Sequence, residues 1–173
     1  MRKRSCVVAI VVFSSLSAPF LTGCAGEGRV FNNENVAVTV LLTIASAQGR
    51  YALDCGNGGY AATLLVLGAP SPGARGGFME DASLRSLTPQ TAGYNFVMTA
   101  GAGSAIGPID CNGTQTVTAF YATATPMTLG TTGTRSFAVN QPWTPTSGAI
   151  WQIAGSTAPT EPFGSPAEER HVR

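Results

Sequence analysis

The chain has 173 residues, of which 44% are hydrophobic, with ten basic and nine acidic side chains, and this size fits one domain. Arg2, Lys3 and Arg4 lie in a leader that we expect to be removed, which leaves seven basic against nine acidic residues. Such a balance provides no basic surface for binding nucleic acid. Lysine does not occur after Lys3 and the only histidine is His171, so acid–base chemistry near neutral pH has few candidates.

Residues 1–23 have the layout of a secretory leader, with a basic start, an apolar run from Val7 to Phe13 and the ending Leu21-Thr22-Gly23-Cys24. Several serines and Pro19 interrupt the ~20 apolar residues that a membrane span would need. The ending resembles the bacterial lipobox, in which the cysteine is lipid-modified and becomes the first residue. We therefore predict lipidation of Cys24, which would anchor the protein durably if at least two acyl chains are attached. The alternative is cleavage near Ala25 with an unmodified cysteine.

Residues 24–32 include the small and flexible run Ala25-Gly26-Glu27-Gly28 and are predicted to form a tether. The globular domain is predicted over residues 33–153. It opens with a helix over residues 33–53, for which Asn32 or Asn33 would be the N-cap and Glu34 a favourable first-turn acid.

At ~100° per residue, the polar side chains of this helix fall on one narrow stripe and apolar ones fill the opposite arc. The polar stripe consists of Asn35, Thr39, Thr43, Ser46 and Arg50. The apolar arc is wider than that of an ordinary surface helix, so the helix needs cover on more than one side, such as a sheet provides.

The segments after the helix are predicted to be short strands and loops. Residues 60–67 suit one short helical turn or a packed crossover. Residues 73–89 suit an exposed connection with one short strand or turn, and residues 101–110 a flexible link. Four strands are predicted from alternation and β-branched or aromatic content, namely residues 94–99, 115–125 (the longest), 134–139 and 149–153. The fold class is therefore α+β, with one N-terminal helix on a four-stranded antiparallel sheet. Residues 154–173, rich in Pro, Ser, Thr and Glu, are predicted to be disordered.

Cys55 and Cys111 are the cysteines that remain once Cys6 and Cys24 are assigned to the leader and the lipobox. In an exported chain this pair predicts a disulfide, worth ~4 kcal/mol on the loop-entropy model. Each cysteine follows an aspartate, and oxygen-rich loops around Asp54 and Asp110 can hold calcium. Turn chemistry explains the same residues without an ion, and no metal site is predicted.

The remaining motifs give little support for an enzyme. Residues 101–107 are glycine-rich, but Pro108 follows and no helix opens there, unlike a phosphate-binding loop. We see neither a nucleophile elbow nor a carboxylate pair in an apolar pocket, and we predict no cofactor and no small-molecule substrate. Tyr121, Trp143 and Trp151 would suit a binding groove, although a strand tryptophan such as Trp151 is more often part of the core.

The order of several motifs closely resembles the globular half of bacterial type IV pilins and type II secretion pseudopilins. The likeness covers roughly residues 33–153 and includes Gly58-Gly59-Tyr60, the strand around Tyr94, residues 121–126 and, most specifically, residues 130–137, GTTGTRSF. The resemblance implies one long N-terminal helix against an antiparallel sheet, and a building block of filaments rather than an enzyme.

The N-terminus departs from that family. Pilins have a Gly-Phe cleavage motif, a glutamate at mature position five and then an unbroken apolar helix, whereas Gly23 here precedes Cys24 and position five is Gly28. We therefore expect a non-catalytic pilin headpiece on a lipid anchor, in the bacterial envelope and on the outer membrane, facing the periplasm or the cell surface. Its expected partners are the membrane and pilus or secretion-system proteins. The alternative is a periplasmic or surface binding module for calcium or a glycan.

Overall fold

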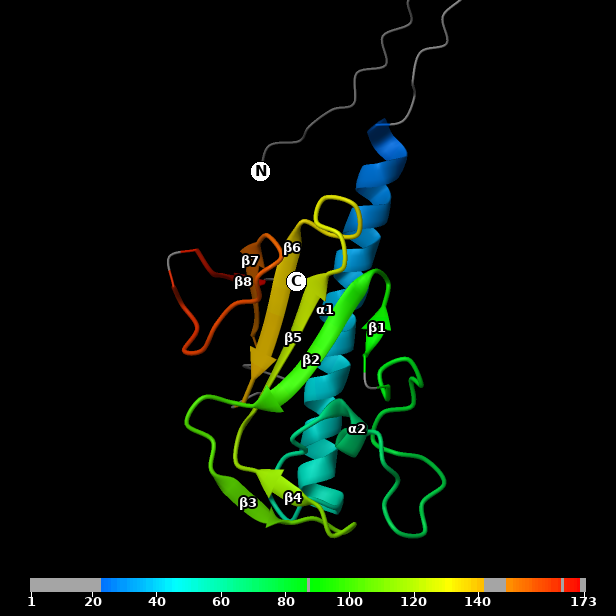
Figure 1. The fold of residues 1–173 in the computed structure, drawn as a ribbon, viewed down its shortest axis with the longest axis vertical. Helices are drawn as coiled ribbons and strands as arrows, with labels where there is room; N and C mark the ends of the chain where they lie inside the picture. The colour runs from blue at the N-terminus through cyan, green and yellow to red at the C-terminus, as the bar shows by residue number, and fades with distance from the viewer. Residues whose placement is uncertain (1–22, 87, 142–148, 166, 172–173) are drawn as a thin grey trace, which may run out of the picture.

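A long helix packed along one face of an antiparallel sheet is the frame of the molecule (Figure 1). The computed structural model describes residues 23–86, 88–141, 149–165 and 167–171. Helix α1 (Gly23–Asp54) spans both ends of the domain, and its first turns project beyond the sheet. The α+β class and the single N-terminal helix on an antiparallel sheet are confirmed.

The main sheet has six strands in the order β1-β2-β5-β6-β7-β8. Their bounds are β1 (Gln90–Thr91), β2 (Tyr94–Ala100), β5 (Phe120–Pro126), β6 (Arg135–Asn140), β7 (Ile150–Ala154) and β8 (Glu169–His171). The prediction of four strands is wrong, because it found only the four central ones. The edge strands β1 and β8 have two and three residues, too few to show a period-two pattern.

The segment predicted as the longest strand is divided between two sheets. Strand β4 (Gln115–Val117) pairs with β3 (Ile106–Ile109) in a separate two-stranded sheet, so the predicted link over residues 101–110 also contains a strand. Val117 exchanges backbone hydrogen bonds with Tyr60, whereas Phe120 is paired with Ala100. The chain therefore changes partners between Val117 and Phe120.

Helix α1 begins at Gly23, so residues 24–32 are helical and the predicted N-cap at Asn32 or Asn33 is wrong. Glycine disfavours helix, but extending an existing helix is far easier than nucleating one. We infer that the packed part of α1 supplies the nucleus for its projecting end. The predicted polar stripe is confirmed, since all five of its residues are exposed.

The core lies between α1 and the inner face of the sheet. Leu41, Ile44 and Tyr51 of α1 are at most 1% exposed, as are Phe96 and Phe137 of the facing strands. Tyr94, Phe96 and Met98 are the buried, alternating residues of β2, as predicted. The short helix α2 (Leu64–Leu67), predicted as one helical turn and capped by Thr63, contributes two further buried leucines.

The segment after β7 lies over the outer face of the sheet, and the predicted disorder of residues 154–173 is wrong for its described part. Phe163 stacks on Trp151 with ring centroids 5.5 Å apart and lies 6.1 Å from Tyr121. Ser136, on the outer face of β6, is fully buried and donates a hydrogen bond to the Gly155 carbonyl at 2.8 Å. Strand β8 then pairs with β7, so this segment, residues 155–171, closes the outer layer.

Candidate functional site

The predicted lipidation site, Cys24, is the second residue of α1, at the projecting end of the helix. Residues 1–22 of the predicted leader lie outside the described residues. The stretch Gly26–Asp54 is long and apolar enough to cross a membrane, and 44% of its most apolar window is buried in the domain. An N-terminal helix of this kind suits a signal or a membrane anchor, and the core helix of a soluble domain has the same composition.

Glu34 is a buried charge that joins α1 to the beginning of β6. Its side chain is 4% exposed. One carboxylate oxygen accepts hydrogen bonds from the backbone N–H and hydroxyl of Thr134, at 2.8 and 2.7 Å. The other accepts from Nε and Nη2 of Arg135, at 2.9 and 2.5 Å. Burial acts to raise the pKa of Glu34, but the bonds from Arg135 and Thr134 outweigh it and hold the pKa below its ordinary value.

The sequence contained a signal for this contact that our predictions did not use. Glu34 precedes Val38 by four residues and Leu41 by seven, which puts it on the buried face of α1. A charge on such a face requires a partner. Arg135 belongs to GTTGTRSF, the most specific of the motifs that resemble pilins.

The loop between β5 and β6 is fixed beside the upper part of α1 (Figure 1). Asn33 donates from Nδ2 to the Thr132 carbonyl at 3.0 Å, and Tyr94 donates to the Arg135 carbonyl at 2.8 Å. Gly133 makes room for that tyrosine, because a Cβ atom at Gly133 would lie 1.9 Å from the Tyr94 hydroxyl. Gly133 of the motif is thus required for close packing between β2 and the loop.

A shallow hollow of about 350 Å³ lies between the projecting helix and this loop. Val30, Phe31 and Gly130 line it, together with Glu34 and Thr134. Phe31 is 64% exposed, and Met127 and Leu129 of the same loop are 50% and 53% exposed. This end of the molecule therefore combines buried ionic contacts with an uncovered apolar rim.

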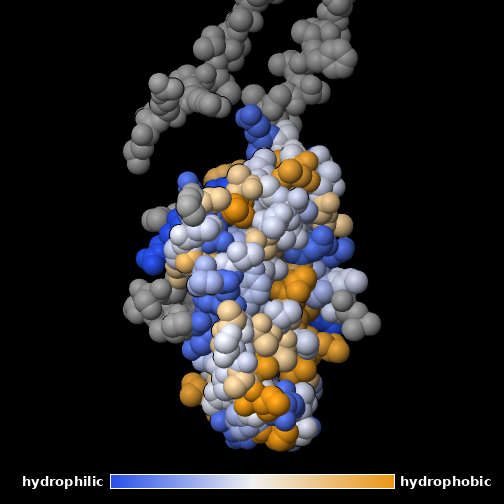
Figure 2. All heavy atoms as spheres, turned by 60° about the vertical axis from the view of Figure 1, so that its left-hand side comes forward, coloured by the Kyte–Doolittle hydropathy of each residue, from blue (hydrophilic) through white to orange (hydrophobic). Residues whose placement is uncertain are grey.

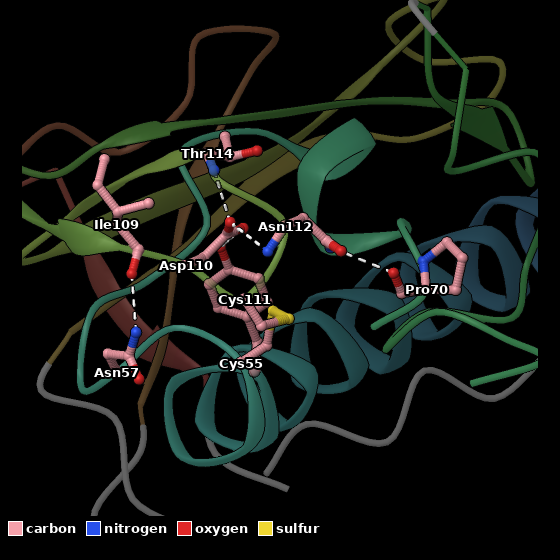
Figure 3. Close-up of a disulfide and its surroundings, with 9 residues drawn as sticks. Cys55, Asn57, Pro70, Ile109, Asp110, Cys111, Asn112 and Thr114 are labelled. Carbon is pink, nitrogen blue, oxygen red and sulfur yellow. Dashed lines mark hydrogen bonds between the residues drawn. A yellow bond between two sulfur atoms is a disulfide. The ribbon is translucent and has the colours of Figure 1, made fainter. Parts of the chain in front are cut away.

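The predicted disulfide between Cys55 and Cys111 is confirmed, with 4.8 Å between the two Cα atoms (Figure 3). It joins the end of α1 to the loop between β3 and β4. Two backbone and side-chain contacts support the same junction, since the Cys111 N–H donates to the Cys55 carbonyl and Asn57 Nδ2 to the Ile109 carbonyl, both at 2.8 Å.

Asp110, the residue before Cys111, organises this loop through its carboxylate. Its Oδ1 accepts from the backbone N–H groups of Asn112 and Thr114, at 2.9 and 2.6 Å, and its Oδ2 from the Tyr51 hydroxyl at 2.6 Å. Burial, followed by the bond to Asp110, raises the pKa of Tyr51 well above its ordinary value. Both oxygens of Asp110 are therefore engaged by the protein itself (Figure 3).

The calcium interpretation of these loops finds no support in the geometry. Asp54 is exposed at the end of α1, while Asp110 is 5% exposed and acts as a turn cap. Nowhere in the described ranges do three His, Cys, Asp or Glu side chains gather as metal ligands would.

The aromatic groove suggested by Tyr121 and Trp151 is filled by the chain's own Phe163. Trp143, the third residue of that suggestion, lies outside the described residues. Glu161 secures the covering segment, accepting hydrogen bonds from Asn140 Nδ2 and from the Ala102 N–H. Burial first, and then the negative charges of Glu161 and Glu168, raise the pKa of Tyr121 to about 12.

A groove of about 440 Å³ lies between α2 and β2. Leu65, Pro89, Val97 and Met98 line it together with uncharged polar residues. None of its lining residues is an acid, a base or a cysteine, so the lining supplies no general base to activate the hydroxyls of Thr63, Ser86 and Thr88.

No family model, curated protein or solved structure matches this chain. What the structure shares with the pilin-like layout is therefore the coarse arrangement, a long apolar N-terminal helix on an antiparallel sheet.

Proposed function

We propose that this protein is a non-catalytic, pilin-like component of the bacterial cell envelope, attached to the membrane by a lipid on Cys24 and acting through protein contacts. We place it on the outer membrane, facing the periplasm or the cell surface, as an accessory to a type IV pilus or type II secretion system.

The observation that supports this proposal is the placement of the helix. Helix α1 packs lengthwise on the sheet and then projects beyond it, so that Cys24 lies at one end of the molecule. The uncharged groove beside α2 favours a binding surface over a catalytic centre.

Changing Cys24→Ser tests the anchor. The lipid acceptor is then lost, and the protein should move from the membrane fraction to the soluble fraction without incorporating labelled fatty acid. Cys6→Ser is the matched control, because that residue lies in the leader, and it should leave attachment unchanged. Fatty acid retained in the Cys24 variant would disprove the assignment.

The interaction role is tested by cross-linking the full chain in native membranes and identifying what is recovered. We expect envelope proteins of a pilus or secretion assembly. We also expect no filaments of this chain, because polar Glu27, Arg29, Asn32 and Asn33 occupy the helix segment that packs in a pilus core. Electron microscopy that shows this subunit as the repeating unit of a fibre would overturn that part of the proposal.

A further inference from the structure

Three exposed apolar side chains lie on α1 and on the loop fastened beside it, and we call them the apolar collar: Phe31, Met127 and Leu129, which are 64%, 50% and 53% exposed. They come from α1 and from the loop between β5 and β6. Figure 2 shows hydrophobic atoms near the upper part of the body, below the projecting end of α1, and again at the lower end.

The collar is a fixed feature of the fold rather than a group of loose side chains. Asn33 bonds the loop carbonyl of Thr132, and Glu34 binds Thr134 and Arg135 at the end of the same loop. The loop carrying Met127 and Leu129 is therefore fastened to the helix that carries Phe31.

We propose that the apolar collar rests at the outer edge of the headgroup layer of the lipid bilayer, so that the domain sits on the membrane surface in a defined orientation. This inference rests on the proposed attachment at Cys24, and it adds a second contact with the lipid that the anchor alone does not require.

The length of the helix puts the collar within reach of the bilayer. Cys24 and Phe31 belong to one continuous helix, and at 1.5 Å per residue their Cα atoms lie ~10 Å apart along its axis. Helical side chains lean toward the N-terminus, which shortens that distance. The polar layer on each side of the hydrocarbon is ~5–8 Å thick. A lipid inserted at Cys24 thus brings the collar to the outer edge of that layer.

Continuity of the chain identifies the membrane as the occupant. The leader with its apolar run from Val7 to Phe13 joins α1 at the projecting end, so a lipidated Cys24 and an uncut leader both place the bilayer there. Aromatic and aliphatic side chains are the residues that enter the interface. The exposed Arg29 suits anionic headgroups, and Glu27, also exposed, opposes them.

The lower end of the molecule supplies an internal comparison. Leu53, Ile106 and Ile109 are 86%, 79% and 50% exposed, so they are as apolar and as uncovered as the collar. Leu53 is 29 residues from Cys24 on the same helix, which corresponds to ~43 Å. The proposal predicts lipid contact for the collar and none for Leu53.

The test uses the full chain with a single added cysteine at Met127 or Leu129, and Leu53→Cys and Leu65→Cys as matched exposed controls. Each variant is labelled with an environment-sensitive fluorophore in membranes whose lipids include nitroxide-headgroup lipids. Cys55 and Cys111 are bonded to each other, and a lipidated Cys24 has no thiol to react, so the parent chain reports the background.

Labels at positions 127 and 129 should shift to shorter wavelength and lose most of their emission, while those at 53 and 65 keep theirs. Equal quenching at both ends, or none at the collar of membrane-bound protein, would overturn the proposal and leave the anchor standing. A collar label that shifts without nitroxide quenching would indicate a protein contact and also overturns it. Fractionation of the same samples reports the anchor separately, and soluble protein would refute both.

Discussion

At the scale of single residues, Glu34 is a charged side chain that is only 4% exposed and therefore needs hydrogen-bond partners within the protein. A buried carboxylate is stabilised only when its hydrogen-bonding capacity is filled, and Glu34 has partners on both oxygens. The partners are about 100 positions away along the sequence, so the contact closes the fold at the top of α1.

Glu34→Gln should destabilise the domain by about 1.5–3 kcal/mol near neutral pH, because it removes a charged acceptor that faces the Arg135 guanidinium. The folded-state pKa of Glu34 lies below the ordinary value of 4.5. Its contribution is therefore fully present above pH 4.5 and is lost as the pH falls through the lower folded-state value. In denaturant unfolding, the difference in unfolding free energy between wild type and variant should become smaller at acid pH.

Glu27→Gln, at an exposed position of the same helix, should leave the unfolding free energy almost unchanged. If the difference in unfolding free energy between wild type and Glu34→Gln were the same at every pH, the role given to the Glu34 charge would be contradicted.

The turn between β1 and β2 gives a second prediction at this scale. Ala92 and Gly93 connect the paired residues Thr91 and Tyr94, with φ of 49° and 73°. A two-residue hairpin of this kind favours Asn or Gly at its first position, and alanine in the left-handed region costs ~1–2 kcal/mol. Ala92→Gly should therefore raise the melting temperature.

Gly93→Ala should lower the melting temperature, because its Cβ would lie 2.7 Å from the Cβ of Thr132. Adjacent substitutions in the same turn are thus expected to act with opposite sign in thermal unfolding. If both substitutions shifted the melting temperature in the same direction, the left-handed conformation of this turn would not explain their effect on stability.

At the scale of elements, the segment 155–171 shows how order can arise without an apolar pattern. Glu168 accepts hydrogen bonds from the N–H groups of Thr160, Gly164 and Ser165. Burial acts to raise the pKa of Glu168, but these backbone bonds prevail and lower it. One aromatic ring and a few carboxylates therefore hold the segment on the sheet.

Phe163→Ala should loosen this covering segment and cost about 2 kcal/mol, less than the loss of a fully buried phenylalanine. Limited proteolysis should then cut between residues 155 and 171, and tryptophan emission should move to longer wavelength as Trp151 becomes wetter. Thr157→Ala, at an exposed position, is the control and should remain resistant. Equal resistance of both variants would mean that Phe163 does not secure the segment.

The elements that were predicted correctly are those whose own side chains carry the pattern. The polar stripe of α1 and the alternation of Tyr94, Phe96 and Met98 are local signals, and the disulfide followed from the number of available cysteines. The helical turns before Asn33 and the order around Phe163 depend on contacts elsewhere in the fold. The pairing of Glu34 with Arg135 was missed for the same reason, although the position of Glu34 on the buried face indicated that a partner exists.

At the scale of the whole molecule, α1 is fastened near both of its ends. Glu34 binds the start of β6 near the projecting end, and Cys55 is bonded to Cys111 just after the helix ends. The first contact joins α1 to β6, and the second joins the end of α1 to the loop between β3 and β4.

Replacing both cysteines with serine should lower the free energy of unfolding by ~4 kcal/mol on the loop-entropy model. Wild type unfolded in the presence of a reductant should approach the stability of that double variant, and the reductant should not affect the variant itself. Wild-type stability that does not respond to complete reduction would rule out a stabilising role for the bridge.

The two fastenings also make the response to mechanical force depend on which end is pulled. A force on the N-terminal end of α1 is resisted by the Glu34–Arg135 ion pair and by the Cys55–Cys111 disulfide, which lie at separate points along the helix. Many contacts between α1 and the sheet must therefore break together. A force on the C-terminal end of the chain acts first on β8, an edge strand of three residues. Its few pairs with β7 are then the first contacts to break. A pull on the C-terminal segment should therefore separate residues 155–171 from the sheet before it breaks the contacts that hold α1.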